Sequence, residues 1–186
     1  KAVIKNDVVF HFAGLSDLNE ALNNPKKSIM LNILGTVNLL DLCKTYKIKR
    51  FIHASSIYVD SEQGGFYRSS KRAAEDYIEE YKKRFNLKFT ILRFGSLYGN
   101  RADSSNGVKR IIDLALKSNK IEYYGSTKSE REYIHVKDAA IACIKAMSKK
   151  YENKHLIATG PKKIKVVQYR KILNKLLDNK KSINFI

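Results

Sequence analysis

Chemistry in this 186-residue sequence begins with a tyrosine and a lysine four positions apart, Tyr67 and Lys71. Residues at this spacing lie on the same face of a helix, so the lysine ammonium can stabilise a phenolate at the tyrosine. Such a positive charge lowers the pKa of a phenol from about 10 toward neutral pH. The pair therefore predicts a general base or acid.

The surroundings of this pair distinguish it from two other tyrosine–lysine pairs with the same spacing. Tyr67 and Lys71 follow a short apolar run, Phe51–Ala54, and a glycine-bearing loop, and they stand at the start of a long helical pattern. That order places them at the carboxyl edge of a sheet. The other matches are interpreted as coincidental, one across a turn and one in a strand-like run: Tyr124/Lys128 and Tyr133/Lys137.

Two hydroxyl groups leave the same predicted strand. Ser55 and Ser56 come directly after Phe51–Ala54. A hydroxyl at this edge can hydrogen-bond the substrate oxygen on which the tyrosine acts. We therefore expect a serine and Tyr67 to share one site.

Small residues follow the first predicted strand, Val8–Phe12, which leads into Ala13 and Gly14. Ligands approach the backbone closely at such a strand end, although a plain tight turn is the alternative interpretation. The phosphate-binding motif G-x-G-x-x-G does not occur among the nine glycines. Either no dinucleotide binds, or the motif precedes Lys1, and the small-residue exit favours the second interpretation.

The elements that would position these residues alternate along the chain. Apolar runs at Val8–Phe12, Phe51–Ala54 and Thr90–Phe94 are separated by helical patterns near Pro25–Tyr46 and Ser70–Phe85. This alternation predicts a parallel sheet, and the two-sided apolarity of the runs indicates helices on both faces. The fold class is therefore a doubly wound, Rossmann-type α/β sheet. A smaller α/β region is expected after it, from a short run and three helical patterns: Ile121–Tyr124, Val108–Lys117, Lys137–Ser148 and Val166–Leu177.

Composition excludes several classes of protein. The net charge is +18, but the lysines are scattered without a block of like charge, so phosphates of a small ligand are expected rather than nucleic acid. No apolar run reaches the roughly 20 residues of a membrane helix. Cys43 and Cys143 stand far apart, which predicts neither a disulfide framework nor a metal site and favours the cytoplasm.

Other charged and polar residues are interpreted as structural. Arg93 on a central strand is expected to form an internal ion pair, and Glu75 and Glu79 are interpreted as a solvated helix face. Three histidines in apolar strand patterns are expected to be core or edge residues: His11, His53 and His135.

Together these motifs resemble the extended short-chain dehydrogenase/reductases of the NAD-dependent epimerase/dehydratase type, in particular nucleotide-sugar epimerases such as UDP-glucose 4-epimerase. The resemblance runs from about Val8 to Val166. It is carried, in chain order, by His-Phe-Ala-Gly at 11–14, Asn32 with Gly35-Thr36, Ala-Ser-Ser at 54–56, Tyr67/Lys71, Leu92-Arg93, Leu97-Tyr98-Gly99 and Arg-Glu-Tyr-Ile-His-Val at 131–136.

The resemblance implies a cofactor site for NAD. Ala13 and Gly14 would line its diphosphate and ribose, and Asn32 would touch the cofactor side of the sheet. Lys71 would bridge the nicotinamide ribose and Tyr67. The glycine-rich unit that completes such a site would precede Lys1.

The resemblance also implies the reaction. Tyr67 would take the proton of a sugar 4-hydroxyl while NAD transiently oxidises that carbon, with Ser56 as the catalytic hydroxyl and Ser55 as the alternative. Arg131 would pair with a nucleotide phosphate. Ser96 would contact the sugar or phosphate, but it stands where the family has asparagine, which leaves the exact substrate open.

A sugar-nucleotide 4-epimerase is therefore expected, with a nucleotide-sugar substrate and no nucleic-acid or membrane partner. An NAD(P)-dependent reductase of the same family is the alternative, as is a non-catalytic nucleotide-sensing or nucleic-acid-binding relative. Residues 1–96 would form the C-terminal part of the NAD-binding domain and 97–186 the substrate-binding region, with 131–150 returning to pack on the first. The wide apolar surfaces of the helices near Pro25–Tyr46 and Ser70–Phe85 indicate either a thick core or a homodimer interface.

Overall fold

The computed structural model describes residues 3, 5–117, 120–121, 129–176 and 184–185. The chain divides into two compact units, which are described separately. The first contains Lys1–Phe94 and Ala140–Ala158, and the second contains Gly95–Ala139 and Thr159–Ile186. The Tyr124/Lys128 pair lies outside the described residues. Assigning a cofactor or substrate role to either unit stays a prediction.

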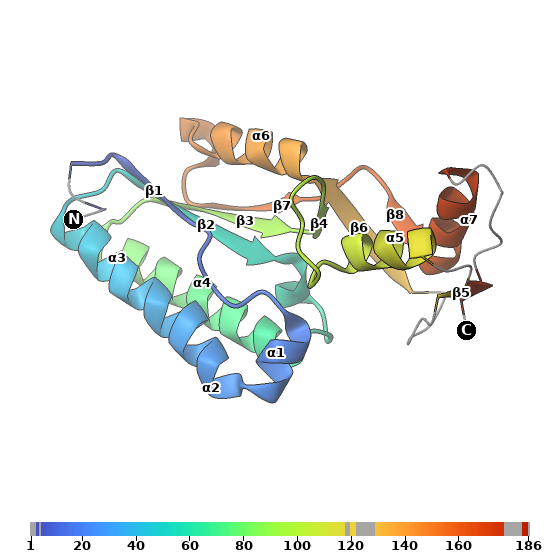
Figure 1. Ribbon diagram of the computed structural model, residues 1–186. Coiled ribbons are helices and arrows are strands. Elements are labelled where there is room, and N and C mark those ends of the chain that lie inside the picture. The colour runs from blue at the N-terminus through green and yellow to red at the C-terminus, as the bar shows by residue number, and fades with distance from the viewer. Residues whose placement is uncertain (1–2, 4, 118–119, 122–128, 177–183, 186) are drawn as a thin grey trace. The chain divides into compact units, whose positions relative to one another are not determined.

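The first unit is built on a four-stranded parallel sheet in the order β1-β2-β3-β7 (Figure 1). The strands are β1 Val8–His11, β2 Arg50–Ser56, β3 Phe89–Phe94 and β7 Lys154–Ala158. The parallel, doubly wound sheet predicted from the alternating pattern is confirmed. The edge strand β7 is an addition that the sequence analysis did not predict.

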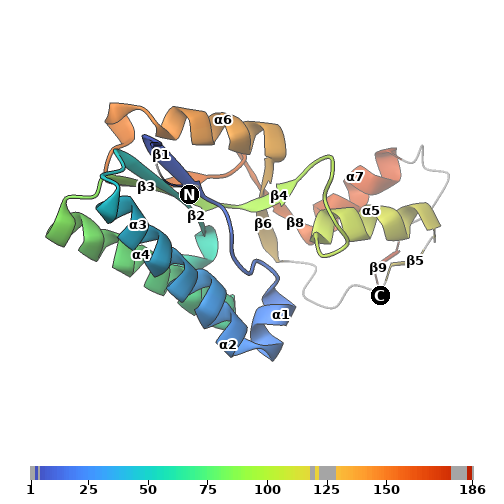
Figure 2. The same cartoon turned by 60° about the vertical axis from the view of Figure 1, so that its left-hand side comes forward.

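The helices that connect β1, β2 and β3 along the chain cover one face of this sheet. α3, Gly35–Thr45, and α4, Gly65–Phe85, lie side by side against it (Figures 1 and 2). Tyr81 of α4 donates a hydrogen bond to Asp41 of α3 at 2.8 Å. α6, Val136–Ala146, lies on the opposite face through its residues from Ala140 onward (Figure 1). The remaining helices of this unit are α1 Leu18–Asn23, α2 Pro25–Ser28, the π-helix η1 Ile29–Leu34, and the 3-10 helices η2 Ile57–Asp60 and η3 Lys149–Tyr151.

The π-helix η1 interrupts what the sequence pattern predicts as one continuous helix near Pro25–Tyr46. The backbone N–H of Gly35 donates to the carbonyl of Met30, five residues earlier. This wider turn occurs mostly as single insertions in α-helices at functional sites. It places Asn32 in the interior, where only 1% of its surface is exposed.

Two glycines and an asparagine set the ends of α4. Gly64 and Gly65 have φ angles of +98° and +50°, in the left-handed region where a side chain is strained. Asn86 ends the helix at φ +56°, as asparagine often does. The helix therefore begins earlier than its predicted start near Ser70, and Tyr67 lies in its first turn.

The core of the first unit lies between the sheet and the α3–α4 layer. Phe51 and Ile91 of neighbouring strands pack there against Leu40 of α3 and Ile78 of α4, and each is at most 1% exposed. Burying side chains of this size contributes about 1.5–3 kcal/mol each. This rigid layer fixes the face of α4 that carries Tyr67 and Lys71.

The second unit contains a three-stranded sheet in the order β4-β6-β8. Its β4 and β6 are parallel, and β6 and β8 are antiparallel. This is a smaller α/β region of the kind predicted. Its elements are β4 Ser96–Tyr98, α5 Gly107–Lys117, β5 Lys120–Ile121, β6 Glu130–His135, β8 Lys163–Lys165, α7 Val166–Leu176 and β9 Asn184–Phe185.

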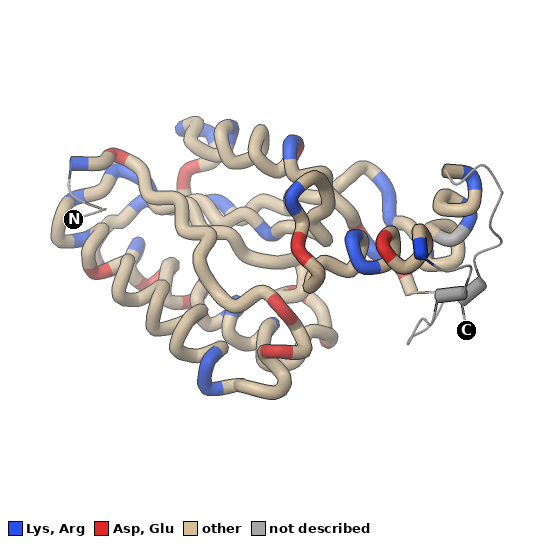
Figure 3. The backbone as a smooth tube through the Cα atoms, in the orientation of Figure 1, with Lys and Arg blue, Asp and Glu red and all other residues tan. Residues whose placement is uncertain are grey.

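Basic residues are spread along most elements of both units (Figure 3). This agrees with the scattered lysines of the sequence. None of the helices in the described part of the chain has the length and apolarity needed to span a membrane.

Candidate active site

Tyr67 is held in a small apolar cluster beside the end of β2. Its side chain is 9% exposed and packs with Leu15 and Ala21, and Tyr58 meets it edge-on with ring centres 6.3 Å apart. The hydroxyl of Ser56 interacts with the phenol and acts to lower its pKa. The structure therefore brings together the tyrosine and one of the two serines that the sequence singles out.

Ser55 and Ser56 point to different partners, because successive side chains of a strand face opposite sides of the sheet. Ser56 lies against Tyr67, and its hydroxyl also accepts a hydrogen bond from the Tyr58 backbone N–H at 3.3 Å. Ser55 instead donates to Glu75 at 2.5 Å. Ser56 is thus the hydroxyl placed for chemistry at the phenol.

Lys71 lies one turn after Tyr67 on the same face of α4 and is 6% exposed. Its ammonium donates to the carbonyl of Ala54 at 3.0 Å, which ties the helix to the end of β2. Burial lowers the pKa of Lys71 to about 8, while the nearby Glu75 carboxylate acts in the opposite direction. The site therefore holds a cation that is easily deprotonated.

The pKa of Tyr67 differs from the expectation that Lys71 lowers it. Burial raises the pKa of the phenol, the Ser56 hydroxyl acts against this, and nearby Tyr58 raises it further. The physical reason is that the phenol packs in the apolar cluster while the Lys71 ammonium is directed to a backbone carbonyl. Without ligands, Tyr67 is a neutral phenol that can donate a proton.

The loop after β1 approaches this lysine closely. A Cβ atom at Gly14 would lie 2.6 Å from Oδ1 of Asn32 and 3.6 Å from Nζ of Lys71, at a φ of +153°. Only glycine fits so tight a space in that conformation. Ala13 and Gly14 therefore form the close backbone passage at the strand end that the sequence predicts.

Asn32 joins three segments around the site. Its Oδ1 accepts from the Leu15 backbone N–H at 2.7 Å, and its Nδ2 donates to the Leu15 carbonyl at 3.0 Å and to Ser70 at 2.8 Å. The amide thereby fixes the loop after β1 to α4. Direct contact of Asn32 with a cofactor stays a prediction.

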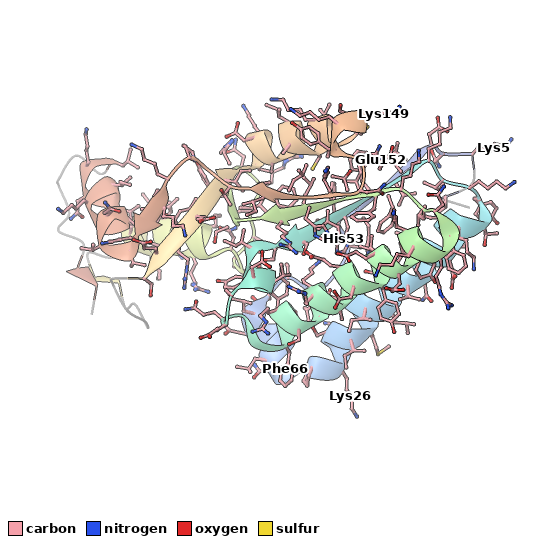
Figure 4. All side chains as sticks on the ribbon, turned by 180° about the vertical axis from the view of Figure 1, so that it is seen from behind. Lys5, Lys26, His53, Phe66, Lys149 and Glu152 are labelled. Carbon is pink, nitrogen blue, oxygen red and sulfur yellow. The ribbon has the colours of Figure 1, made fainter. Side chains whose placement is uncertain are left out.

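Two histidines lie on the sheet beneath the lysine. His53 is 1% exposed and lies between the sheet and α4 (Figure 4). His11 neighbours it with ring centres 5.3 Å apart, and its Nε2 is 3.0 Å from the hydroxyl of Thr36. Burial, followed by the charge of Lys71, lowers the pKa of His11 to about 4 and lowers that of His53 strongly. Both are core residues that are neutral at pH 7, as expected, but neither ring nitrogen of His53 has a hydrogen-bond partner among the described residues.

Glu75 does not belong to a solvated helix face. It is 1% exposed, and Arg93 donates to its carboxylate from Nη2 at 2.6 Å and from Nε at 3.1 Å. His155 Nδ1 lies 3.3 Å from the same carboxylate. The prediction fails because Glu75 follows Lys71 by four residues and so shares the buried face, a spacing that could have revealed it. Glu79, one turn further, is 42% exposed.

The two predicted substrate contacts, Ser96 and Arg131, belong to the second unit. Ser96 begins β4 and pairs in register with Tyr133 of β6. Arg131 lies on β6, and its Nη1 donates to the Glu130 carbonyl at 3.4 Å. No carboxylate pairs with Arg131 among the described residues. Their roles stay predictions.

These residues fit the ribose and phosphate part of a dinucleotide. Within the described part of the chain, the Lys71 ammonium makes one hydrogen bond, to Ala54, so two of its three N–H groups remain available. The close backbone passage at Gly14 adjoins them at the carboxyl end of β1. Open α/β sheets bind their ligands at this edge.

The fold and this edge define the class: a Rossmann-type α/β protein with a serine–tyrosine–lysine site. The chain belongs to the NAD dependent epimerase/dehydratase family, whose model matches residues 1–158. The family resemblance and the nicotinamide cofactor class predicted from the sequence are thus confirmed.

Individual relatives include both epimerases and dehydratases. The dTDP-D-glucose 4,6-dehydratase of Dictyostelium discoideum is 29% identical over 162 residues, covering 74% of this chain and 37% of that protein. The UDP-glucuronate 4-epimerase of Thermodesulfobacterium geofontis is 26% identical over 189 residues, covering 92% and 57%. This chain thus spans between about a third and three fifths of their lengths.

A solved structure shares the fold over nearly the whole chain. The UDP-glucose 4-epimerase of Thermotoga maritima, crystallised with UDP-glucose, superposes with a TM-score of 0.87 at 25% identity. The match covers 97% of this chain and 64% of that protein. The doubly wound architecture is therefore that of a nucleotide-sugar epimerase.

Proposed function

We propose that this chain is part of a sugar-nucleotide 4-epimerase that works by NAD-mediated transient oxidation of the sugar 4-hydroxyl. The observation that carries the proposal is the placement of Ser56 beside the Tyr67 phenol, with buried Lys71 one turn further along α4. UDP-sugar epimerases among the relatives support the substrate class.

In the proposed reaction, Tyr67 moves the proton. Its phenolate takes the proton of the 4-hydroxyl and later returns it, while Ser56 hydrogen-bonds the same sugar oxygen. NAD, when bound, supplies the hydride acceptor and donor. Burial raises the pKa of Tyr67 in the free site, so the proposal requires that the Lys71 ammonium come to favour the phenolate once NAD and substrate are bound.

The cofactor-binding residues of this proposal lie at the carboxyl edge of the sheet in the first unit. Ala13, Gly14 and Lys71 hold the cofactor, and Asn32 fixes the loop that contains Ala13 and Gly14. Arg131 binds a nucleotide phosphate and Ser96 contacts the substrate. These two roles rest on the family resemblance. The role of Arg131 also rests on the observation that no carboxylate forms an ion pair with it among the described residues.

Two residues after Ser56 favour epimerisation over dehydration. Dehydratases of this family carry an acidic pair directly after the catalytic hydroxyl, where this chain has Ile57 and Tyr58. The nearest carboxylate beyond them, Asp60, accepts a hydrogen bond from Arg93 at 2.5 Å and is thus engaged elsewhere. The protein should therefore lack the carboxyl group that removes water.

The first prediction tests the proton carrier in the full-length protein. Tyr67→Phe should lower turnover by about 10²–10⁴-fold and leave the binding of NAD and UDP-sugar unchanged, because only the phenolic proton is lost. Turnover is measured as interconversion of UDP-glucose or UDP-glucuronate with its 4-epimer. Binding is measured by calorimetry.

Tyr133→Phe is the matched control, since Tyr133 also precedes a lysine by four residues but lies on β6. It should leave the pH profile of turnover unchanged. Loss of activity in Tyr133→Phe with retention in Tyr67→Phe would overturn the site assignment. Net consumption of NADPH instead of epimerisation would identify the reductase alternative.

A further inference from the structure

The buried carboxylate of Glu75 contacts side chains from three strands of the sheet, β2, β3 and β7. Ser55 of β2 donates to it, Arg93 of β3 binds it through two nitrogens, and His155 of β7 lies against it. Burial alone would raise the pKa of Glu75, but the neighbouring His155 and hydrogen bonds from Arg93 and Ser55 lower it to about 2. The group is therefore a permanent anion inside the first unit.

The ion pair controls both ends of the segment that contains Ser56. Glu75 holds Ser55, the residue directly before Ser56, at 2.5 Å. Arg93 reaches the other end, where its Nη1 donates to Asp60 at 2.5 Å at the close of η2. The short stretch from Ser55 to Asp60 is thus tied at both ends to one charge pair.

The same carboxylate is fixed to the helix that carries the proton-transfer residues. Glu75 follows Lys71 by one helical turn and Tyr67 by two, so all three lie on one face of α4. Its negative charge also favours the ammonium form of Lys71. One residue therefore connects the serine strand to the tyrosine–lysine helix.

Stability alone gives a weak reason for such a pair. A buried ion pair is often no more stabilising than apolar side chains of similar volume, because both charges lose their hydration. Here the two charges connect strand, 3-10 helix and long helix at the point where the three site residues meet. The gain is in geometry, to which proton transfer is sensitive.

We infer that Glu75 and Arg93 form a positioning pair that sets the distance between Ser56 and the Tyr67–Lys71 face of α4. This inference rests on the proposed function, because it assigns the pair a role in the same site. Neither residue needs to touch substrate or cofactor.

The test uses the full-length protein and the double variant Glu75→Gln/Arg93→Gln, which removes both charges of the pair together. Its kcat should fall by about 10²-fold with little change in KM, since a misplacement near 1 Å has effects of this size. The alkaline limb of the pH–rate profile should also move to lower pH, because Lys71 loses its nearby anion. Ser55→Ala, which removes one hydrogen bond, should show the same kcat effect to a smaller extent.

A second readout needs no turnover. Lys71 can be followed by ¹³C NMR of reductively methylated lysines, assigned with Lys71→Arg, and its titration should shift to lower pH in Glu75→Gln. The conservative variant Arg93→Lys keeps the positive charge, so its kcat should be higher than that of the double variant. Glu80→Gln, which changes an exposed α4 carboxylate that pairs with Lys83, is the matched control and should change neither kcat nor the Lys71 titration.

The outcomes separate this inference from the proposed function. If Tyr67→Phe abolishes turnover while the double variant keeps wild-type kcat and pH profile, the positioning role is wrong and the proposed function stands. If Tyr67→Phe retains turnover, the proposed site itself is wrong. An effect of the double variant on kcat no larger than that of Glu80→Gln would also overturn the positioning role.

Discussion

At the scale of a single residue, the lowered pKa of His11 makes the stability of the folded protein depend on pH. Burial and the charge of Lys71 lower its pKa to about 4, whereas a histidine in the unfolded chain titrates near 6.5. The folded protein therefore binds fewer protons than the unfolded chain between these values. The stability that His11 contributes is present above about pH 6.5 and is lost as the pH falls toward 4.

The corresponding prediction concerns His11→Gln. Wild-type protein should lose about 2 kcal/mol of unfolding free energy through His11 between pH 7 and pH 5, and the variant should lack this part of the loss. Urea unfolding at the two pH values measures it. An identical pH dependence in variant and wild type would contradict the prediction.

His155 is the matched comparison because its pKa shifts in the opposite direction. The neighbouring Glu75 carboxylate raises the pKa of His155, with burial opposing, and both Glu75 and Glu79 face its ring together with Arg93. Its stabilising contribution is therefore present below about pH 6.5 and is lost as the pH rises through the folded pKa. His155→Gln should destabilise the protein more at pH 5 than at pH 8.

At the scale of elements, one amide joins the loop after β1, η1 and α4. Asn32→Ala would leave the Leu15 backbone N–H and carbonyl buried without their partner. Each unsatisfied group costs about 1–3 kcal/mol, so the variant should be destabilised by at least that amount in urea unfolding. It should also weaken NAD binding, because the loop carries Gly14.

Asn38→Ala is the control for this element prediction. Asn38 is exposed on α3, two turns from Asn32, so its substitution should change stability by no more than about 0.5 kcal/mol. Equal effects of the two variants would contradict the proposed link between the three segments.

An element could be predicted from the sequence where its own residues determine its structure, and not where its structure depends on a partner that is distant in the sequence. The strands β1, β2 and β3 are apolar on both faces, so their residues alone indicate a covered parallel sheet. The strand β7 begins Lys-His, and its identity depends on pairing with β3. The π-helix η1 was not predicted because an apolar helical pattern does not distinguish α from π turns.

The same reasoning applies within the candidate site. Tyr67, Lys71 and the serines were predictable because their spacing and place after a strand carry chemical meaning. The spacing of Glu75 from Lys71 could have placed it on the buried face, but its partners Ser55, Arg93 and His155 could not be predicted, because they come from strands that are distant in the sequence. The pKa of Tyr67 likewise depends on packing partners that are distant in the sequence.

At the scale of the whole molecule, the α2–η1–α4 surface of the first unit carries many exposed apolar side chains. Among the described residues these include Ile29, Met30, Leu34 and Tyr77, each between 47% and 62% exposed. Leu39 is half-buried and packs against the core, so it is a poorer probe of this surface than Tyr77. We propose that two copies pair through it as a homodimer.

Such pairing must overcome repulsion, because each chain carries a net charge of +18. Salt screens charge repulsion between exposed groups, so the dimer should strengthen from low salt to about 0.15 M, where the screening length is about 8 Å. Tyr77→Glu and Met30→Glu should shift the full-length protein toward monomer in sedimentation at micromolar concentration, since each places a charge in the apolar contact. Ile144→Glu, at a residue 63% exposed on α6, is the matched control and should leave the dimer intact. A wild-type monomer at 0.15 M salt, or equal weakening by the control, would show that the exposed apolar surface has another role.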